Sequence, residues 1–138
     1  MSSPSEVERD PERLDLLLIE DDAAVAEMYR MTLEQDGYTV RVASDGPSGL
    51  ALAEQTAPDL IFLDVRLPGM DGFSVLERMR LSASTRFTPV VILSAYGESE
   101  LRERGVRLGA LEYVIKSQTT PGQISGRVPA WTSAPSPE

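Results

Sequence analysis

The chain has 138 residues, of which 41% are hydrophobic, so it fits a single globular domain with one core. Its formal net charge of −9 disfavours direct binding to nucleic acid, because a phosphate backbone would be repelled over most of the surface. It contains no cysteine and no histidine, which excludes disulfides, thiolate metal sites and catalysis by a histidine of its own.

The N-terminal segment, residues 1–13, is rich in Ser, Pro and charged residues and offers almost nothing to bury, so we predict a disordered tail. After it, apolar runs of strand length alternate with amphipathic stretches of helix length. The five predicted strands cover residues 14–19, 38–43, 60–63, 90–93 and 111–115. Strands separated by helices predict right-handed crossovers, and therefore an α/β fold with a doubly wound parallel sheet covered on both faces.

Helix boundaries in the sequence support this alternation. Asp45 and Asp71 precede helical patterns and are predicted N-caps, whereas Gly37 and Gly109 lie where helices should end. Each predicted helix carries apolar residues at helical spacing, among them Val25, Met28, Leu33, Leu50, Leu52, Ala53, Phe73, Leu76, Met79, Leu101 and Leu108.

Polar residues follow four of the strands directly. Glu20 and Asp21 follow the first strand, Asp64 the third, Ser94 the fourth and Lys116 the fifth. In such sheets ligands bind outside the carboxyl ends of the strands. Three carboxylates in one crevice need a cation between them, and oxygen-only ligation points to Mg²⁺ or Mn²⁺. Asp64 keeps an oxygen for attack on phosphorus, while Ser94 and Lys116 can bind phosphoryl oxygens.

Each of these residues also has a purely structural interpretation. Acidic residues after a first strand often only favour the positive end of the next helix, and most lysines simply face solvent. The joint pattern favours the chemical interpretation. Chance would have to deliver an acidic pair, an acid, a hydroxyl and a lysine at the ends of strands one, three, four and five, in that order.

Four segments carry a resemblance to a known family: Leu-Ile-Glu-Asp-Asp, Phe-Leu-Asp-Val-Arg-Leu-Pro-Gly-Met-Asp-Gly, Pro-Val-Val-Ile-Leu-Ser-Ala and Gly-Ala-Leu-Glu-Tyr-Val-Ile-Lys. From about residue 14 to residue 116 the chain resembles the receiver domain of bacterial two-component response regulators. The resemblance implies a flavodoxin-like sheet of strand order 2-1-3-4-5. We predict that the receiver domain spans residues 14–128.

The resemblance also implies a role for each site residue. Asp64 would be the phosphoacceptor, and Lys116 would bind the phosphoryl group. The metal ligands would be Glu20, Asp21, Asp64 and the backbone carbonyl of Arg66.

Switching is implied in the same way. Ser94 would be the switch hydroxyl, drawn toward the acyl phosphate, and Tyr113 the switch aromatic, which then rotates inward and alters the face of the fourth helix and fifth strand. Arg66 and Tyr96 would flank the water path and tune the phosphoryl lifetime, with the bulky Tyr96 slowing hydrolysis.

The C-terminal part departs from the family pattern. Ser117 stands where the family usually has a proline after the lysine. The last helix has a capping-box start, but Gly122 and Gly126 weaken it and Pro129 is expected to end it, so we predict a short or irregular helix and a disordered tail over residues 129–138. Either this short helix docks on the sheet, which we favour, or it leaves an open apolar edge with Trp131 as an anchor for self-association or a target.

We therefore expect a stand-alone receiver that accepts a phosphoryl group from a sensor histidine kinase or phosphotransfer protein and acts through an unknown protein target, with a homodimer possible. It would not be an enzyme beyond self-catalysed transfer and slow autodephosphorylation. The sequence has no signal peptide or membrane span, so we expect a soluble cytoplasmic protein without direct nucleic-acid or membrane contacts. Two alternatives stay open. One is a Mg²⁺-dependent phosphohydrolase with an aspartyl-phosphate intermediate, although such enzymes usually carry a second Asp where this chain has Arg66; the other is a pseudo-receiver that needs no phosphorylation.

Overall fold

The computed structural model describes residues 13–133 of the chain. The predicted N-terminal tail lies, apart from Arg13, outside the described residues. Five strands form one sheet, namely β1 (Asp15–Ile19), β2 (Thr39–Ala43), β3 (Leu60–Leu63), β4 (Val90–Ser94) and β5 (Glu112–Ile115). Their order is β2-β1-β3-β4-β5 and every neighbouring pair is parallel, which confirms the predicted doubly wound fold.

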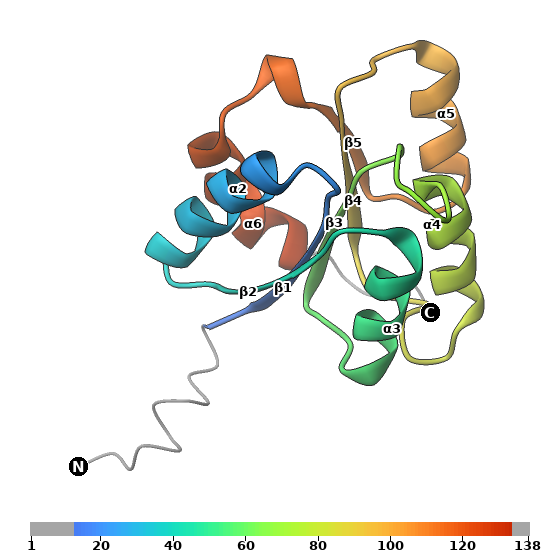
Figure 1. Cartoon of the computed structure of the whole chain (residues 1–138), viewed down its shortest axis with the longest axis horizontal. Helices are drawn as coiled ribbons and strands as arrows, with labels where there is room; N and C mark the ends of the chain where they lie inside the picture. Colours follow the sequence, from blue (N-terminus) through green and yellow to red (C-terminus); the bar gives the residue numbers. More distant parts are fainter. Residues whose placement is uncertain (1–12, 134–138) are drawn as a thin grey trace.

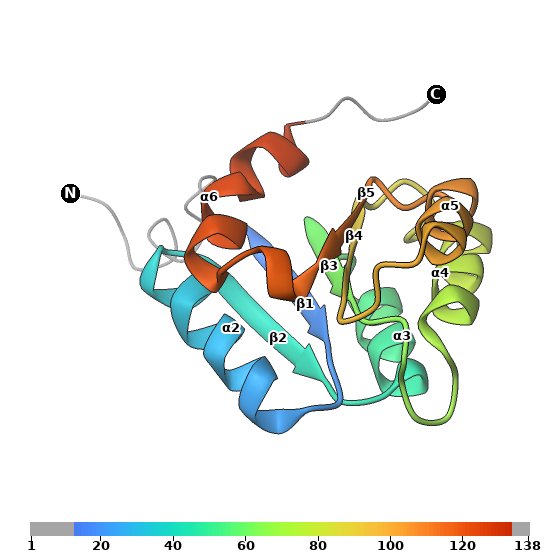
Figure 2. The same cartoon turned by 90° about the horizontal axis from the view of Figure 1, so that it is seen from above.

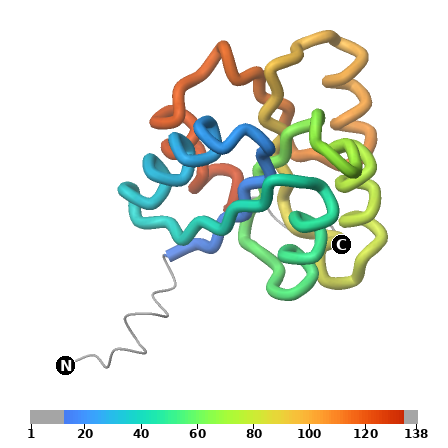
Figure 3. Tube along the Cα trace, in the orientation of Figure 1, coloured from blue at the N-terminus to red at the C-terminus, as the bar shows by residue number. Residues whose placement is uncertain are grey.

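A helix follows each strand, and together the helices cover both faces of the sheet (Figure 1). They are α2 (Ala23–Gln35), α3 (Gly46–Gln55), α4 (Gly72–Leu81), α5 (Ser99–Arg107) and α6 (Pro121–Thr132), with a short 3₁₀ turn η1 (Lys116–Gln118) after β5. Figure 2 shows α2 and α6 on one side of the sheet and α3, α4 and α5 on the other. Figure 3 follows the chain through this alternation.

The predicted helix boundaries explain where these crossovers begin and end. Asp45 and Asp71 accept hydrogen bonds from the backbone N–H groups of Ser48 and Ser74, and so cap α3 and α4. Gly37 and Gly109 have φ angles of 99° and 101°, the left-handed conformation that ends a helix without a steric penalty only at glycine.

Alternating strand residues feed two separate hydrophobic cores, one on each face of the sheet. The core under α3, α4 and α5 contains the large buried side chains Leu17, Ile19, Ile61, Leu63, Phe73, Leu76, Met79 and Ile92. The core under α2 and α6 contains Leu16, Leu18, Tyr29, Leu33, Leu60, Phe62, Leu93, Ile124, Val128 and Trp131. The central strands are therefore buried on both faces, as a parallel sheet requires.

The last helix is short, as predicted, but its predicted end was wrong. Helix α6 has 12 residues and continues through Pro129 to Thr132, so residues 129–132 are helical and not part of a tail. Proline removes only one hydrogen bond here. The final turn keeps the bond from the Ser133 N–H to the Pro129 carbonyl, at 3.1 Å, and adds one from the Thr132 hydroxyl to the Val128 carbonyl, at 2.8 Å.

Helix α6 docks on the sheet, so the open-edge interpretation was wrong. Ile124 and Val128 are fully buried and Trp131 is 4% exposed. The Trp131 ring meets Phe62 of β3 edge to face, with 5.8 Å between ring centroids, and its Nε1 donates to the Glu112 carboxylate of β5 at 3.0 Å. Trp131 is thus a core residue and not an exposed anchor.

Across residues 13–133, every helix is too short or too polar to span a bilayer.

Candidate functional site

The carboxyl ends of β1, β3 and β4 meet at one edge of the sheet. Ile19 pairs with Leu63, which pairs in turn with Ile92. The backbone N–H of Asp64 still donates to the Ile19 carbonyl, at 3.1 Å, so pairing continues one residue past the strand. The residues that directly follow β1 and β3 are held by this ladder.

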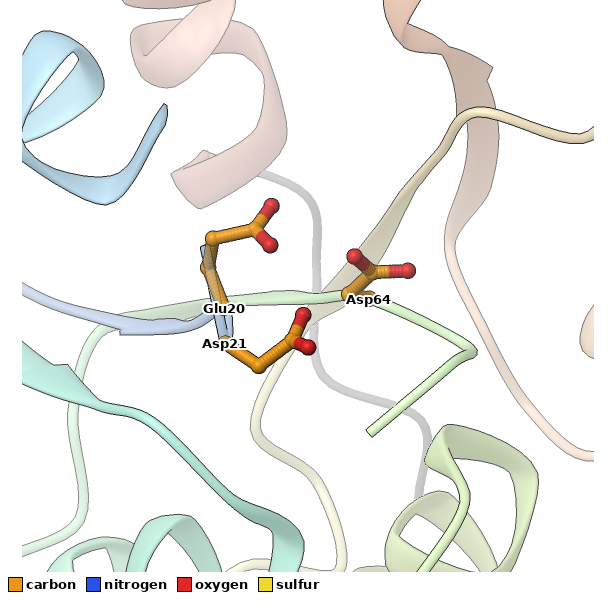
Figure 4. Close-up of side chains that lie close together, drawn as sticks. All are labelled: Glu20, Asp21 and Asp64. Atoms are coloured by element: carbon orange, nitrogen blue, oxygen red, sulfur yellow. The ribbon is translucent and has the colours of Figure 1, made fainter. Parts of the chain in front are cut away.

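Three carboxylates converge at this edge (Figure 4). One oxygen from each of Glu20, Asp21 and Asp64 can be chosen so that all three lie within 4.8 Å of one another. Glu20 is 3% exposed and Asp64 8% exposed, whereas Asp21 is open to solvent. The structure therefore brings together the acidic residues that we expected to meet, with one open side for an incoming group.

This donor set fits a hard divalent cation. All three groups supply carboxylate oxygens, which Mg²⁺ and Mn²⁺ prefer, and one exposed ligand leaves room for water or a phosphoryl oxygen. The role of the Arg66 backbone carbonyl as a further ligand stays a prediction.

Lys116 reaches the same carboxylates from the end of β5. Its Nζ donates to Glu20 Oε1 and, at 3.0 Å, to Asp64 Oδ2. Burial alone would lower the pKa of Lys116, but the hydrogen bond to Glu20 and the charge of Asp64 outweigh it and raise the pKa. Burial raises the pKa of Glu20, and the hydrogen bond from Lys116 offsets only part of that rise. The lysine stays charged and directly faces the carboxylate of Asp64.

The segment after Lys116 contains Ser117 in place of the family's usual proline. All peptide bonds among the described residues are trans, including the bond between Lys116 and Ser117. The chain turns instead through η1.

The loop from β3 to α4 wraps closely around Asp64. Asp64 Oδ1 accepts the backbone N–H of Arg66 at 3.2 Å, and the Gly72 N–H donates to the Val65 carbonyl at 2.9 Å. A Cβ atom on Gly72 would lie 2.2 Å from the backbone oxygen of Asp64, so only glycine fits there. The conformation of Asp64 thus depends on this close approach.

Ser94 and Tyr96 form the opposite side of the site. Ser94 is fully buried at the end of β4, and its Oγ accepts the backbone N–H of Tyr96 at 3.0 Å. The guanidinium of Arg66 stacks on the Tyr96 ring, 4.1 Å from its centroid. The two residues expected to flank the water path are therefore in direct contact.

Tyr113 already points inward, although we expected that rotation to follow phosphorylation. It is 6% exposed, and its hydroxyl donates to the Tyr96 backbone carbonyl at 2.6 Å. Burial raises the pKa of Tyr113, so the phenol remains neutral and donates this bond.

One arginine beside the site was not predicted from the sequence. Arg104 of α5 stacks on Phe73, with 4.4 Å between its guanidinium carbon and the ring centroid. It lines a cleft of about 520 Å³ that also borders Asp21 and Arg66. No motif marks Arg104; only its place on the charged outer side of α5 could have drawn attention to it.

Comparison with known proteins gives a consistent family match. The family model described as the response regulator receiver domain matches residues 16–127. Among curated relatives, RpaA of Synechocystis sp., described as a DNA-binding dual master transcriptional regulator, is 43% identical over 101 residues, which are 73% of this chain and 42% of that protein. The phosphate regulon transcriptional regulatory protein PhoB of Escherichia coli is 37% identical over 115 residues, which are 83% of this chain and 50% of that protein. The chain thus spans about half the length of these relatives.

Comparison with solved structures agrees with this family match. Chemotaxis protein CheY4 of Vibrio cholerae superimposes with a TM-score of 0.80 at 28% identity, covering 86% of this chain and 98% of that one. The receiver domain of sensor histidine kinase PA1611 from Pseudomonas aeruginosa gives 0.81 at 26% identity, covering 88% and 99% respectively, and that structure holds a magnesium ion in its active-site cleft.

Proposed function

Because the chain belongs to the family of response regulator receiver domains, we propose that it accepts a phosphoryl group on Asp64 from a phosphohistidine of a sensor histidine kinase or phosphotransfer protein. The observation that carries this proposal is the pairing of Asp64 with Lys116 beside two further carboxylates at one sheet edge. The 138 residues contain no histidine, so the donor histidine lies outside this sequence. The family is a signalling family, and we assign the chain no enzymatic activity beyond this self-catalysed transfer and a slow loss of the phosphoryl group.

The divalent cation, Mg²⁺ or Mn²⁺, would be held by Glu20, Asp21, Asp64 and the Arg66 backbone carbonyl, and when bound it neutralises charge on the incoming phosphoryl group. Asp64 is the nucleophile and attacks phosphorus in line with the departing imidazole. Lys116, already beside Asp64, pairs with a second phosphoryl oxygen.

Ser94 completes the phosphoryl site. Its Oγ accepts the Tyr96 N–H and keeps its own proton, which it can donate to a phosphoryl oxygen. Arg66 and Tyr96, stacked on each other beside Asp64, limit the approach of water and so lengthen the life of the acyl phosphate.

The output passes through the face formed by α5 and β5. A pocket of about 540 Å³ opens there, bordered by Arg102, Tyr113, Arg127, Gln118 and Gln123. Tyr113 borders this pocket and donates to the Tyr96 carbonyl, and the Tyr96 N–H donates to Ser94 Oγ, so a change at Ser94 reaches the surface through Tyr96 and Tyr113. We infer that a protein target binds this face, with a second copy of the chain as the other possible occupant.

Intact-mass spectrometry tests the proposal. We expect acetyl phosphate with Mg²⁺ to add one phosphate to the wild-type chain, and to add none when the metal is chelated or when Asp64→Asn is used. Asp59→Asn is the matched control, because Asp59 caps the backbone N–H of Asp15 at the opposite end of the sheet. Phosphate uptake by Asp64→Asn, or its absence in the wild type, would reject the assignment.

A further inference from the structure

The stack between Arg66 and Tyr96 ties together the two loops that flank the site. Arg66 follows Asp64 by two residues in the loop after β3, and Tyr96 follows Ser94 by two residues in the loop after β4. Within residues 13–133, the Arg66 guanidinium has no carboxylate at ion-pair distance. The aromatic ring, 4.1 Å away, is therefore its main contact.

The backbone of Tyr96 is also where the inward Tyr113 is held. The Tyr96 carbonyl accepts the Tyr113 hydroxyl at 2.6 Å, and the Tyr96 N–H donates to Ser94 Oγ at 3.0 Å. A phenol hydroxyl buried without a partner is unfavourable, so the bond to this carbonyl favours the inward position of Tyr113. The position of the Tyr96 backbone thus affects the position of Tyr113.

The space that Tyr113 occupies is already built into the fold. A Cβ atom on Gly105 of α5 would lie 3.3 Å from Tyr113 Cδ2 and 2.7 Å from Ile92 Cδ1. A Cβ on Gly97 would lie 2.5 Å from Ile115 Cδ1, so the loop after β4 rests closely on β5. The missing side chain at Gly105 leaves room for the inward Tyr113 ring, and the missing side chain at Gly97 lets the loop after β4 approach β5.

We propose that Arg66 is a positioning residue that, by stacking on Tyr96, fixes the carbonyl that receives the Tyr113 hydroxyl and so holds Tyr113 inward before any phosphoryl group arrives. The inference rests on the proposed function, because it concerns how the same site regulates the α5–β5 face. Ser94 Oγ accepts the Tyr96 N–H and still carries a proton that it can donate to a phosphoryl oxygen, so Ser94 can act in the phosphoryl site without giving up this bond. Phosphorylation then further increases the inward population of Tyr113, which Arg66 already favours.

Fluorine NMR on a chain labelled with 3-fluorotyrosine tests this directly. The chain has four tyrosines, and Tyr113→Phe identifies the resonance of interest. In Arg66→Met, without phosphodonor, we expect the outward population of Tyr113 to rise about two- to five-fold, as the loss of an exposed cation–π contact allows. Tyr96→Leu keeps the backbone carbonyl but removes the ring, so it should move the resonance equally, and the double variant should add nothing further.

Arg104→Met is the matched control. Arg104 is also an exposed arginine stacked on an aromatic ring, and it borders the same cleft, but its partner is Phe73 and not Tyr96. It should leave the Tyr113 resonance at its wild-type position. An unchanged resonance in Arg66→Met, or an equal change in Arg104→Met, would overturn the inference. Phosphate uptake by the wild type is measured separately and tests the proposed function. The proposed function and the role of Arg66 can therefore fail independently.

Discussion

Lys116 is the residue on which the electrostatics of the site depend most. It pairs with two carboxylates, and the exposed fractions of the side chains are 18% for Lys116, 3% for Glu20 and 11% for Asp64. Without the lysine, two largely buried negative charges would face each other unpaired.

We predict that Lys116→Gln lowers the free energy of unfolding of the metal-free protein by about 2–3 kcal/mol, somewhat less than a fully buried pair would lose. Urea denaturation gives the value. Arg127→Gln is the control, since its ion pair with Glu112 is 48% and 35% exposed, and it should change stability by less than about 1 kcal/mol. Equal losses in the two variants would contradict a special role for the Lys116 pair.

Most site residues could be predicted from the sequence, because they directly follow apolar strands whose ends must coincide in a parallel sheet. Glu20, Asp21 and Asp64 are such residues, and the structure gathers them. The orientation of Tyr113 could not be predicted, because it depends on the Tyr96 carbonyl and on space left by Gly105, neither of which has a sequence pattern. The stacking of Arg104 on Phe73 could not be predicted either, because no sequence pattern marks this contact.

At the scale of elements, helix α6 shows how far sequence signals extend. The predicted strand bounds differ from the observed ones by one residue at most, because each apolar run is followed directly by a polar or charged residue. The start of α6 was also predictable, since the capping box between Thr120 and Gln123 is local. Its end was not, because the penalty of Pro129 is local whereas the burial of Trp131 against Phe62 comes from a distant strand.

We predict that Trp131→Ala lowers the free energy of unfolding by about 3–4 kcal/mol, since it removes a buried ring and leaves Glu112 with one donor fewer. Leu81→Ala, at the end of α4 with Leu81 85% exposed, should change it by less than about 0.5 kcal/mol. Thermal and urea unfolding followed by circular dichroism compare the two. An unchanged free energy of unfolding in Trp131→Ala would mean that α6 contributes little to the core.

The glycines of α4 and α6 should respond in opposite directions. A Cβ at Gly126 meets no atom within 4 Å, so Gly126→Ala should stabilise the helix by about 0.5–1 kcal/mol. Gly72→Ala should destabilise the protein by more than about 2 kcal/mol, because its Cβ would overlap the Asp64 carbonyl. Melting temperatures of both variants check the prediction, and a stabilised Gly72→Ala would show that the loop around Asp64 is not closely packed.

At the scale of the whole molecule, the net charge of −9 adds to the mutual repulsion of Glu20, Asp21 and Asp64, and a bound cation would relieve this repulsion. We predict that Mg²⁺ at about 100 times its dissociation constant adds roughly 2.7 kcal/mol of stability at constant ionic strength. Asp64→Asn should raise the metal-free melting temperature, because it removes one of the carboxylates that repel one another. About 1 kcal/mol of relieved repulsion corresponds to a rise of about 3–6 °C. Calorimetry with and without Mg²⁺ tests both statements, and a wild-type midpoint that ignores millimolar Mg²⁺ would count against the metal site.

The most direct test of the central claim is chemical trapping of the acyl phosphate. After incubation with acetyl phosphate and Mg²⁺, borohydride reduction converts a phosphorylated aspartate to homoserine, which peptide mass spectrometry locates by residue. We predict homoserine at position 64 only, in the peptide that contains Asp64 and Arg66. Homoserine at Asp21, reduction of Glu20, or no reduced residue at all would contradict the assignment of Asp64 as the phosphoacceptor.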